Sequence, residues 1–212
     1  MLARERLADA RLYLVCDARP AAWLAAALRG GVDVIQLRDK SLDDVGLVAA
    51  ARAFREAADA TGALFVLNDR PDLVEACDAD GVHVGQDDVT PHEARTLVGG
   101  RRVVGRSTHA PDQLAAAAAD PDVDYCAVGP VHATPTKPGR PAAGLSYVEH
   151  AAAHDPGKPW FAIGGLHAGN IHEVTARGAA RVVVVRAITD APDPELAARE
   201  LRARLEVPVG SP

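Results

Sequence analysis

Short runs rich in β-branched and other apolar residues alternate along the chain with longer stretches in which Ala and Leu recur at helical spacing. Several short runs are apolar at consecutive positions, as in the valines from Val182 to Val185. Strands that are covered on both faces have this composition, which favours a parallel sheet. The pattern predicts eight strands, at Leu12–Cys16, Asp33–Leu37, Leu64–Asn68, Gly81–Gly85, Val103–Ser107, Tyr125–Val131, Trp160–Gly165 and Val182–Ala187.

The stretches between these strands carry helix start and stop signals. Asp43 lies in a predicted first turn, Pro91 lies near a first helical position, and Gly62 follows a helical stretch. The predicted helices are Ala21–Leu28, Asp43–Ala60, a short one at Pro71–Cys77, Pro91–Val98, Ala110–Ala119, Ser146–Ala153, Asn170–Ala176 and Pro194–Leu205.

The number of strand–helix units indicates the fold class. Eight units in 212 residues leave about 26 residues for each unit. A closed (β/α)8 barrel needs ~200 residues or more, whereas an open doubly wound sheet has about six strands. We therefore expect an α/β fold, a (β/α)8 TIM barrel, with residues 1–212 as a single domain and 208–212 as a frayed tail.

Charge and composition exclude several classes of protein. Lys and Arg total 23 against 29 Asp and Glu, so the net charge is −6 and we expect no nucleic-acid partner. No apolar run approaches the ~18 residues that span a bilayer, so we expect no membrane partner. Cys16, Cys77 and Cys126 are isolated and odd in number, which predicts buried, reduced thiols and a cytoplasmic protein. The sequence leaves the oligomeric state open, a homo-oligomer included.

Polar and glycine-rich segments follow at least six of the predicted strands. They are QLRDK at residues 36–40, NDR at 68–70, QDD at 86–88, STH at 107–109, TPTK at 134–137 and GG at 164–165. In a (β/α)8 barrel, the carboxyl ends of the strands meet at one rim, and this rim carries the chemistry. The sequence therefore predicts a functional site at that rim.

Cations and carboxylates of this rim suit a phosphate ligand with a metal ion. Arg38, Lys40 and Lys137 lie on different loops and can converge on one anion, because guanidinium and ammonium groups both bind phosphate oxygens. Asp69 and Asp88 follow neighbouring strands, and two carboxylates with phosphate oxygens and water commonly surround Mg²⁺.

Two loop segments also suit phosphate binding. Gly164–Gly165 and the backbone after the eighth strand match the phosphate site that the last two loops of a barrel commonly form. Thr134–Lys137 lies in a loop rich in Pro and Gly, and its hydroxyl and ammonium groups suit the same anion. A glycine pair alone is weak support, since it marks many turns.

Each signal also has a purely structural interpretation. Arg38 could form an ion pair with Asp39 or Asp87 on a solvated strand end, and Asp69 could cap the following helix. The acidic pair at 87–88 could be first-turn residues of the helix that begins at 91. His83 alternates with valines, which indicates a hydrogen-bonded residue of the barrel interior more than a metal ligand.

Seven segments form an ordered set from about Tyr13 to Ile188, namely VIQLRDK, LNDRPDL, ADGVHVGQDD, GRSTH, DYCAVGPVHATPTKPG, AIGGL and GAARVVVVRAI. Their order and spacing resemble the thiamine-phosphate synthase family. The resemblance implies a Mg²⁺-dependent barrel enzyme of thiamine biosynthesis, a transferase of alkyl or aryl groups. It would join hydroxymethylpyrimidine diphosphate to a plain or carboxylated thiazole phosphate and release diphosphate, so its partners would be two small phosphorylated substrates.

The resemblance also implies roles for individual residues. The pyrimidine diphosphate would be bound by Gln36, Leu37, Arg38, Asp39, Lys40, Asn68, Ser107 and Lys137. The thiazole phosphate would be bound by Thr134, Pro135, Thr136, Gly165, Val185 and Arg186. Mg²⁺ would be held by Asp69 and Asp88. The catalytic residues would be Arg38, Lys40, Ser107 and Lys137, because they can stabilise charge on the departing diphosphate.

Two positions depart from the family pattern, and three other interpretations stay open. Arg186 stands where relatives often have Ser, and His132 stands where an aromatic residue such as Phe is frequent.

A related thiazole tautomerase, which is one alternative interpretation, carries His at the position of Pro130. A non-catalytic phosphate-binding barrel is a second alternative. An aldolase or isomerase is a third, but it would need a Schiff-base Lys or buried Glu at a strand end, and the sequence offers no convincing candidate.

Overall fold

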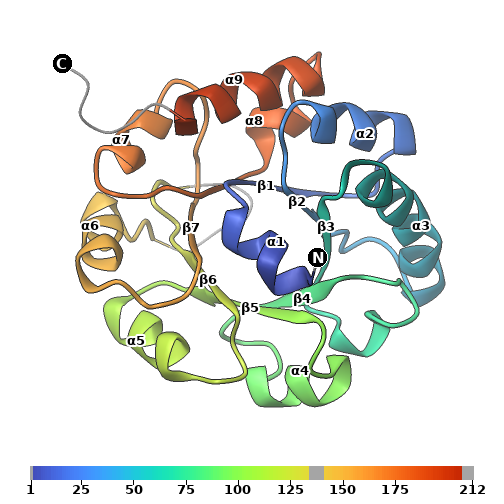
Figure 1. The fold of residues 1–212 in the computed structure, drawn as a ribbon, viewed down its shortest axis with the longest axis horizontal. Coiled ribbons are helices and arrows are strands. Elements are labelled where there is room, and N and C mark those ends of the chain that lie inside the picture. Colours follow the sequence, from blue (N-terminus) through green and yellow to red (C-terminus); the bar gives the residue numbers. More distant parts are fainter. Residues whose placement is uncertain (1, 134–140, 207–212) are drawn as a thin grey trace.

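Eight parallel strands close into a barrel in chain order, with β8 pairing back onto β1. The structure is a computed structural model and describes residues 2–133 and 141–206. Figure 1 looks along the barrel and shows the helices arranged around it. The strands are β1 (Leu12–Cys16), β2 (Val34–Leu37), β3 (Leu64–Asn68), β4 (Gly81–Val84), β5 (Val103–Thr108), β6 (Tyr125–Val128), β7 (Trp160–Ile163) and β8 (Val182–Val184).

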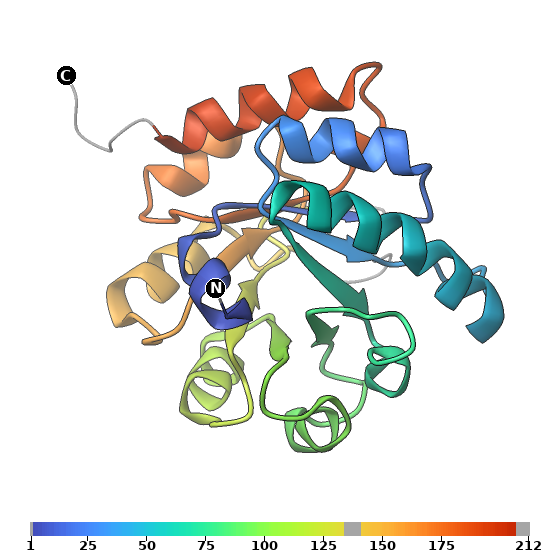
Figure 2. The same cartoon turned by 45° about the vertical axis from the view of Figure 1, so that its right-hand side comes forward.

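Helices follow the strands and cover the outside of the barrel, as the turned view in Figure 2 also shows. They are α1 (Ala3–Asp9), α2 (Ala21–Arg29), α3 (Asp44–Thr61), the 3-10 turn η1 (Pro71–Leu73), α4 (Pro91–Val98), α5 (Pro111–Ala119), α6 (Leu145–His154), α7 (Ile171–Thr175), α8 (Arg186–Thr189) and α9 (Pro194–Glu206). Their ends use the signals in the sequence. The Asp43 side chain caps α3 by accepting from the Gly46 amide at 2.8 Å, and Gly62 ends this helix in a left-handed conformation. None of the described helices is both long enough and apolar enough to cross a bilayer.

The predicted TIM barrel and its eight strands are confirmed, and the boundaries differ in a few places. The predicted strand Val182–Ala187 is wrong at its end, because β8 stops at Val184 and the chain turns into α8. Its last pairs are Ile163 with Val183 and Leu14 with Val184; β7 ends at Ile163, whereas β1 continues to Cys16 without a partner in β8. The predicted helix Pro71–Cys77 is only a 3-10 turn over its first three residues.

The core has two parts, one on each side of the sheet. The larger part lies between the strands and the helices and takes up the outward apolar side chains of each strand, such as Leu37 and Phe65. The smaller part fills the barrel interior, with Tyr13, Tyr125 and Phe161 among its members. Leu7 of α1 belongs to this interior part, so α1 covers the amino-terminal end of the barrel, where Figure 1 shows it in front.

Three aspartates stand directly before β2, β4 and β6 and make the same kind of contact. Each accepts a hydrogen bond from a backbone amide near the start of the preceding strand and forms an ion pair with an arginine of a surrounding helix. The three pairs are Asp33 with Arg202, Asp80 with Arg55, and Asp124 with Arg95. These contacts satisfy buried backbone amides and tie the helices to the strands at the amino-terminal end of the barrel.

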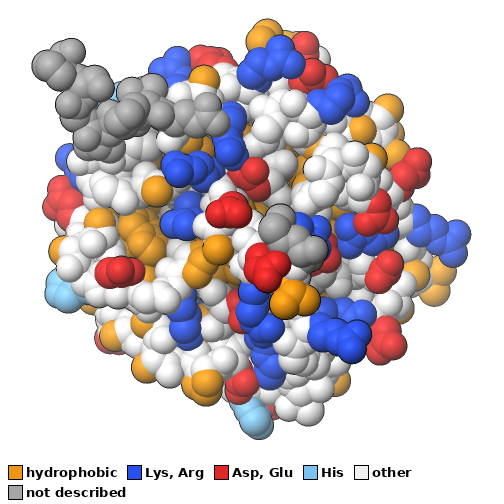
Figure 3. Space-filling view, viewed as in Figure 1, with side chains coloured by type: hydrophobic (Ala, Val, Ile, Leu, Met, Phe, Trp, Pro, Cys, Tyr) orange, Lys and Arg blue, Asp and Glu red, His pale blue; other side chains and the backbone are white. Residues whose placement is uncertain are grey.

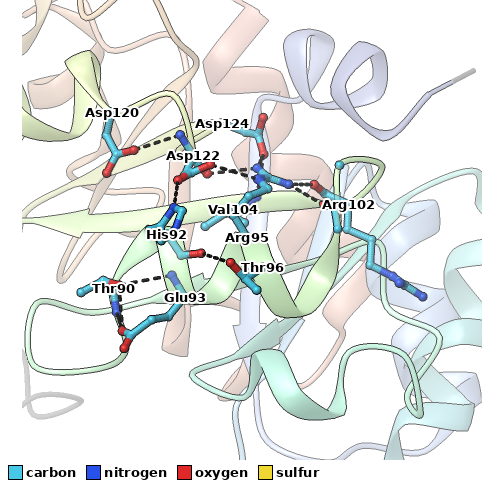
Figure 4. Close-up of polar contacts among 12 residues, drawn as sticks. Thr90, His92, Glu93, Arg95, Thr96, Arg102, Val104, Asp120, Asp122 and Asp124 are labelled. Carbon is cyan, nitrogen blue, oxygen red and sulfur yellow. Dashed lines mark hydrogen bonds and ion pairs between the residues drawn. The ribbon is translucent and has the colours of Figure 1, made fainter.

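Two arginines of α1 join this set of ion pairs. Arg6 contacts Asp80 at 2.8 Å and Arg4 contacts Asp124 at 2.7 Å, which fixes α1 across the end of the barrel. Figure 4 shows Arg95 between Asp122, Asp124 and the Arg102 carbonyl. Figure 3 shows acidic and basic side chains interspersed over this face, without a large area of one charge.

Candidate functional site

The carboxyl ends of the strands surround a cavity of about 340 Å³, at the other end of the barrel from α1. This volume is in the range of small-molecule sites. Seven of the residues that the sequence assigns to the site line it, namely Gln36, Arg38, Asn68, Ser107, Gly165, Val185 and Arg186. These residues come from β2, β3, β5 and the loops after β2, β7 and β8, so one site gathers residues far apart in the chain.

Two guanidinium groups of the cavity wall lack a carboxylate partner. Within the described part of the chain, neither Arg38 nor Arg186 forms a side-chain hydrogen bond or ion pair. The structural alternative for Arg38 is therefore not supported, because Asp39 bonds instead to Ser41 and to the Ala18 amide. Unpaired arginines beside a cavity suit an anionic ligand.

A pair of carboxyl groups lies at the same rim of the barrel, after β3 and β4, but does not line the cavity. Asp69 follows β3 with φ at 59°, a conformation rare outside glycine, and its amide donates to the His83 carbonyl at 2.9 Å. Asp88 follows β4 and turns back to accept from the Gly85 amide at 2.8 Å. The Asp88 carboxyl lies close enough to Asp69 to affect the pKa of that carboxyl. Neither caps a helix, since Arg70 is the N-cap residue of η1 and Thr90 is that of α4.

Burial, together with the nearby Asp88 carboxyl, raises the pKa of Asp69 to about 6. Two groups act against this rise by favouring the carboxylate: the Asn68 amide, which donates to Asp69 at 2.7 Å, and the positive charge of Lys40. Two hard oxygen ligands held this close repel each other when both are ionised. A divalent cation would relieve that repulsion, so Asp69 and Asp88 fit a metal ion such as Mg²⁺.

The glycine pair after β7 brings another loop to the cavity. Gly164 and Gly165 have φ values of 113° and 67°, which favour glycine. A β-carbon on Gly165 would lie 2.9 Å from the His132 β-carbon, so this position also needs glycine for space. His132 itself contacts Glu173 of α7 at 3.6 Å, and its amide donates to the Gly164 carbonyl at 3.1 Å.

Other residues that the sequence assigns to the site do not line the cavity or lie outside the described residues. Leu37 is fully buried in the core between the sheet and the helices and does not line the cavity. Asp39 and Lys40 lie in the loop after β2, beyond the cavity wall. The predictions for Thr134, Pro135, Thr136 and Lys137 fall outside the described residues.

Several cavity residues are not identified as site residues by the sequence motifs. Tyr13, His83, His109 and His167 line the cavity, and Tyr125 bonds to two of these side chains. His83 is a hydrogen-bonded residue of the barrel interior, as its alternation with valines predicts. The same alternation places Tyr13 on the inside of β1, but the pattern alone does not reveal which partner it meets.

None of the cysteines provides a nucleophile for the site. All three are free and buried, and none of them lines the cavity. Burial raises the pKa of Cys16 to about 12 and that of Cys126 to about 11, which keeps both thiols protonated at neutral pH. The arrangement therefore suits chemistry that depends on binding and stabilising charge rather than on a covalent protein intermediate.

Comparisons with known proteins agree with this kind of site. A family model described as thiamine monophosphate synthase matches residues 12–188. The chain is 54% identical over 207 residues to a thiamine-phosphate synthase of Thermobifida fusca, with 95% of each chain covered. It is also 54% identical over 202 residues to one from Thermus thermophilus, covering 92% of this chain and 97% of the relative. The solved thiamine phosphate pyrophosphorylase of Pyrococcus furiosus has a TM-score of 0.84 at 28% identity, covering 96% of this chain and 97% of that one.

Proposed function

The chain belongs to the thiamine monophosphate synthase family, a family of transferases that act on small phosphorylated substrates. From this premise we propose that its cavity joins hydroxymethylpyrimidine diphosphate to a thiazole phosphate and releases diphosphate. The observation that carries the proposal is a pair of guanidinium groups, those of Arg38 and Arg186, which have no partner among the described residues. They line one cavity at the rim where Asp69 and Asp88 follow β3 and β4, although these two carboxyls do not themselves line it.

The reaction moves an electron pair onto the departing diphosphate. The bond between the pyrimidine methylene carbon and the diphosphate oxygen breaks, and its electrons leave with the oxygen. The thiazole nitrogen then donates its lone pair to the methylene carbon, so the positive charge ends on the thiazolium ring. A carboxylated thiazole would afterwards lose carbon dioxide. No protein nucleophile is needed, which agrees with the buried cysteines.

The diphosphate end is proposed to lie between Arg38 and the loop after β2. The Arg38 guanidinium offers a planar set of donors to phosphate oxygens, and Lys40 adds a charge close to Asp69. Gln36, Asn68 and Ser107 line the cavity as well and provide neutral hydrogen-bonding groups. Lys137 is assigned to this end by the family resemblance alone. Together these groups stabilise negative charge as it develops on the leaving group.

Asp69 and Asp88 are proposed to hold Mg²⁺ at this end. Their neighbouring carboxyl oxygens are the hard ligands that this ion prefers, and phosphate oxygens and water would supply the remaining ligands. When bound, the ion acts as a Lewis acid that neutralises charge on the diphosphate. The protein's own part is to keep both carboxylates together and in their ionised form.

The thiazole phosphate is proposed to bind at the wall formed by the loop after β7 and the start of α8. Gly165, Val185 and Arg186 line the cavity together there. Arg186 brings a guanidinium to this wall, so its side chain can pair with the phosphate directly. Each of the two phosphorylated substrates then has a guanidinium group of one cavity to bind, which would hold their reacting atoms close together.

The experiment is turnover with both substrates and Mg²⁺, followed by separation and quantification of thiamine phosphate. We expect Arg38→Ala to lower kcat/KM by ~10²-fold or more, by analogy with the loss of one donor to developing charge. Arg199→Ala is the matched control, because Arg199 is an exposed residue of α9 that pairs with Glu195 of its own helix. No product from the wild-type protein, or equal activity of the two variants, would refute the proposal.

A further inference from the structure

A chain of four hydrogen bonds lies beneath the cavity and connects five side chains. Gln36 Nε2 donates to the Tyr13 hydroxyl at 2.6 Å, and the hydroxyls of Tyr13 and Tyr125 are 3.0 Å apart. The Tyr125 hydroxyl is 3.1 Å from His83 Nδ1, and His83 Nε2 is 2.9 Å from Ser107 Oγ. None of the five residues is more than 8% exposed. Both ends of the chain, Gln36 and Ser107, line the cavity.

The glycine at position 105 makes room for the middle of this chain. A β-carbon on Gly105 would lie 2.1 Å from Tyr125 Cζ and 2.5 Å from His83 Nδ1. No side chain other than hydrogen fits there while the phenol and the imidazole keep their contact. The Tyr125 ring also packs edge-on against Phe161, with centroids 5.8 Å apart, so its hydroxyl is held in place.

The four hydrogen bonds all run in one consistent direction. The Gln36 amide nitrogen can only donate, so the Tyr13 oxygen accepts and sends its single hydrogen to Tyr125. Tyr125 in turn donates to His83 Nδ1, which leaves the hydrogen of the neutral imidazole on Nε2. His83 then donates to Ser107, and the Ser107 hydrogen can point into the cavity.

We propose that Tyr13, Tyr125 and His83 are positioning residues. They determine whether Gln36 and Ser107 each donate a hydrogen bond to the pyrimidine diphosphate or accept one from it. With the chain in the direction described, Gln36 presents its carbonyl oxygen as an acceptor, and Ser107 presents its hydroxyl as a donor. In the opposite direction, Ser107 would donate its hydrogen to His83, and the Gln36 amide would be rotated so that its nitrogen faces the cavity. The inference rests on the proposed function, because that function supplies the ligand.

The chemistry of the ligand matches this sense. An aminopyrimidine offers N–H groups for the Gln36 oxygen, and its ring nitrogens and phosphate oxygens accept from Ser107. Burial raises the pKa values of both tyrosines, so each phenol keeps the hydrogen that it passes along the chain. A buried hydrogen-bond network is stable only when every group in it has a partner, so the loss of one hydroxyl weakens the whole chain.

The test removes one hydroxyl from the middle of the chain. Tyr125→Phe keeps the ring and its packing but leaves Tyr13 and His83 without that partner. We expect kcat/KM for the pyrimidine diphosphate to fall about tenfold, the effect of one lost hydrogen bond. The KM for the thiazole phosphate stays within about twofold, since the chain does not reach that wall.

Tyr147→Phe is the matched control. Tyr147 is also a buried phenol, and its hydroxyl donates to Thr108 at 2.7 Å, but it lies among the core residues outside the barrel and does not line the cavity. Burial raises the pKa of Tyr147 to about 12, so this phenol stays protonated at neutral pH. A general effect of losing a buried hydroxyl would appear in both variants, whereas an effect through the chain appears in Tyr125→Phe only.

A double-mutant cycle with Ser107→Ala tests whether the effect passes through Ser107. If it does, adding Tyr125→Phe to Ser107→Ala lowers kcat/KM by less than about twofold further, because the receiving end is already gone. Independent, multiplying effects would overturn the inference. If Tyr125→Phe does not fold, His83→Gln, which keeps one donor and one acceptor, completes the same cycle and should retain more activity than His83→Phe.

The outcomes separate this inference from the function on which it rests. Wild-type protein that makes product, together with a Tyr125→Phe variant of unchanged kcat/KM, refutes the positioning role alone. Wild-type protein that makes no product refutes the proposed function and the inference with it. A selective loss for the pyrimidine substrate, absent in Tyr147→Phe and not additive with Ser107→Ala, supports both.

Discussion

Asp124 is the residue whose replacement should most clearly separate the stability of the barrel from the chemistry of its rim. Its carboxylate accepts from the Val104 amide at 2.7 Å, from Arg95 at 2.5 Å and from Arg4 at 2.7 Å. The side chains of Asp124 and Arg95 are only 10% and 14% exposed, whereas that of Arg4 is 47% exposed. Asp124→Ala therefore leaves the Val104 amide without its acceptor and leaves Arg95 with only the more distant Asp122 carboxylate, at 4.0 Å (Figure 4).

The size of the effect follows from these burials. Removing one partner of a buried ion pair costs about 3–5 kcal/mol, and an exposed contact such as that of Arg4 adds little. Arg95 keeps the carbonyls of Gly99 and Arg102, so the lower end applies, about 3 kcal/mol. For a chain of this length, about 2–4 °C of Tm is lost per kcal/mol, which predicts a fall of about 6–12 °C.

Scanning calorimetry at neutral pH measures this fall, and Glu200→Ala provides the control. Glu200 pairs with Arg204 on the exposed face of α9, with side chains 53% and 46% exposed, so its removal should cost less than about 0.5 kcal/mol. Turnover of Asp124→Ala at 25 °C should stay near that of the wild type, because the cavity lies at the other end of the barrel. Equal Tm values for the two variants would refute the reasoning.

Three further predictions concern the rim and the thiols. The pKa of Asp69 is raised to about 6, and metal ions bind the carboxylate form, so Mg²⁺ affinity should fall about tenfold per pH unit below 6 and level off above 7. Calorimetric titration between pH 5 and 7.5 checks this, and a constant affinity would remove Asp69 from the metal site. In steady-state assays, Arg186→Ala should raise the KM for the thiazole phosphate about tenfold and leave the KM for the pyrimidine diphosphate unchanged. A rise in the KM for the pyrimidine diphosphate alone would show that Arg186 binds that substrate instead. Cys126→Ala should keep turnover within about twofold, since this thiol is buried away from the cavity, and complete loss in a folded variant would contradict its passive role.

The strands of the barrel could be predicted because each is a continuous apolar run whose burial on both faces is visible in the sequence. β1 and β3 begin and end where the pattern places them. The end of β8 could not be predicted, because the apolar run continues to Val185 while the backbone already turns into α8. The pattern also does not predict α1, a seven-residue helix that buries only Leu7 and is fixed by distant ion pairs.

The rim could be predicted because the barrel fold itself brings strand ends together. The closeness of Asp69 and Asp88 follows from their places after β3 and β4, which are neighbours in the sheet. The sequence contains no comparable pattern that shows which side chains meet across the barrel interior. Tyr125 meets His83 only because residue 105 on the strand between them is glycine, and a glycine within a strand can equally mark a bulge or a tight bend.

The most direct measurement follows both products of one reaction by ³¹P NMR, with the two substrates and Mg²⁺ present. We expect one inorganic diphosphate to appear for each thiamine phosphate, no release when the thiazole phosphate is omitted beyond slow hydrolysis, and a loss of both products in Arg38→Ala. Release of orthophosphate instead, or diphosphate release that does not depend on the second substrate, would contradict a cavity that holds the two substrates together for transfer.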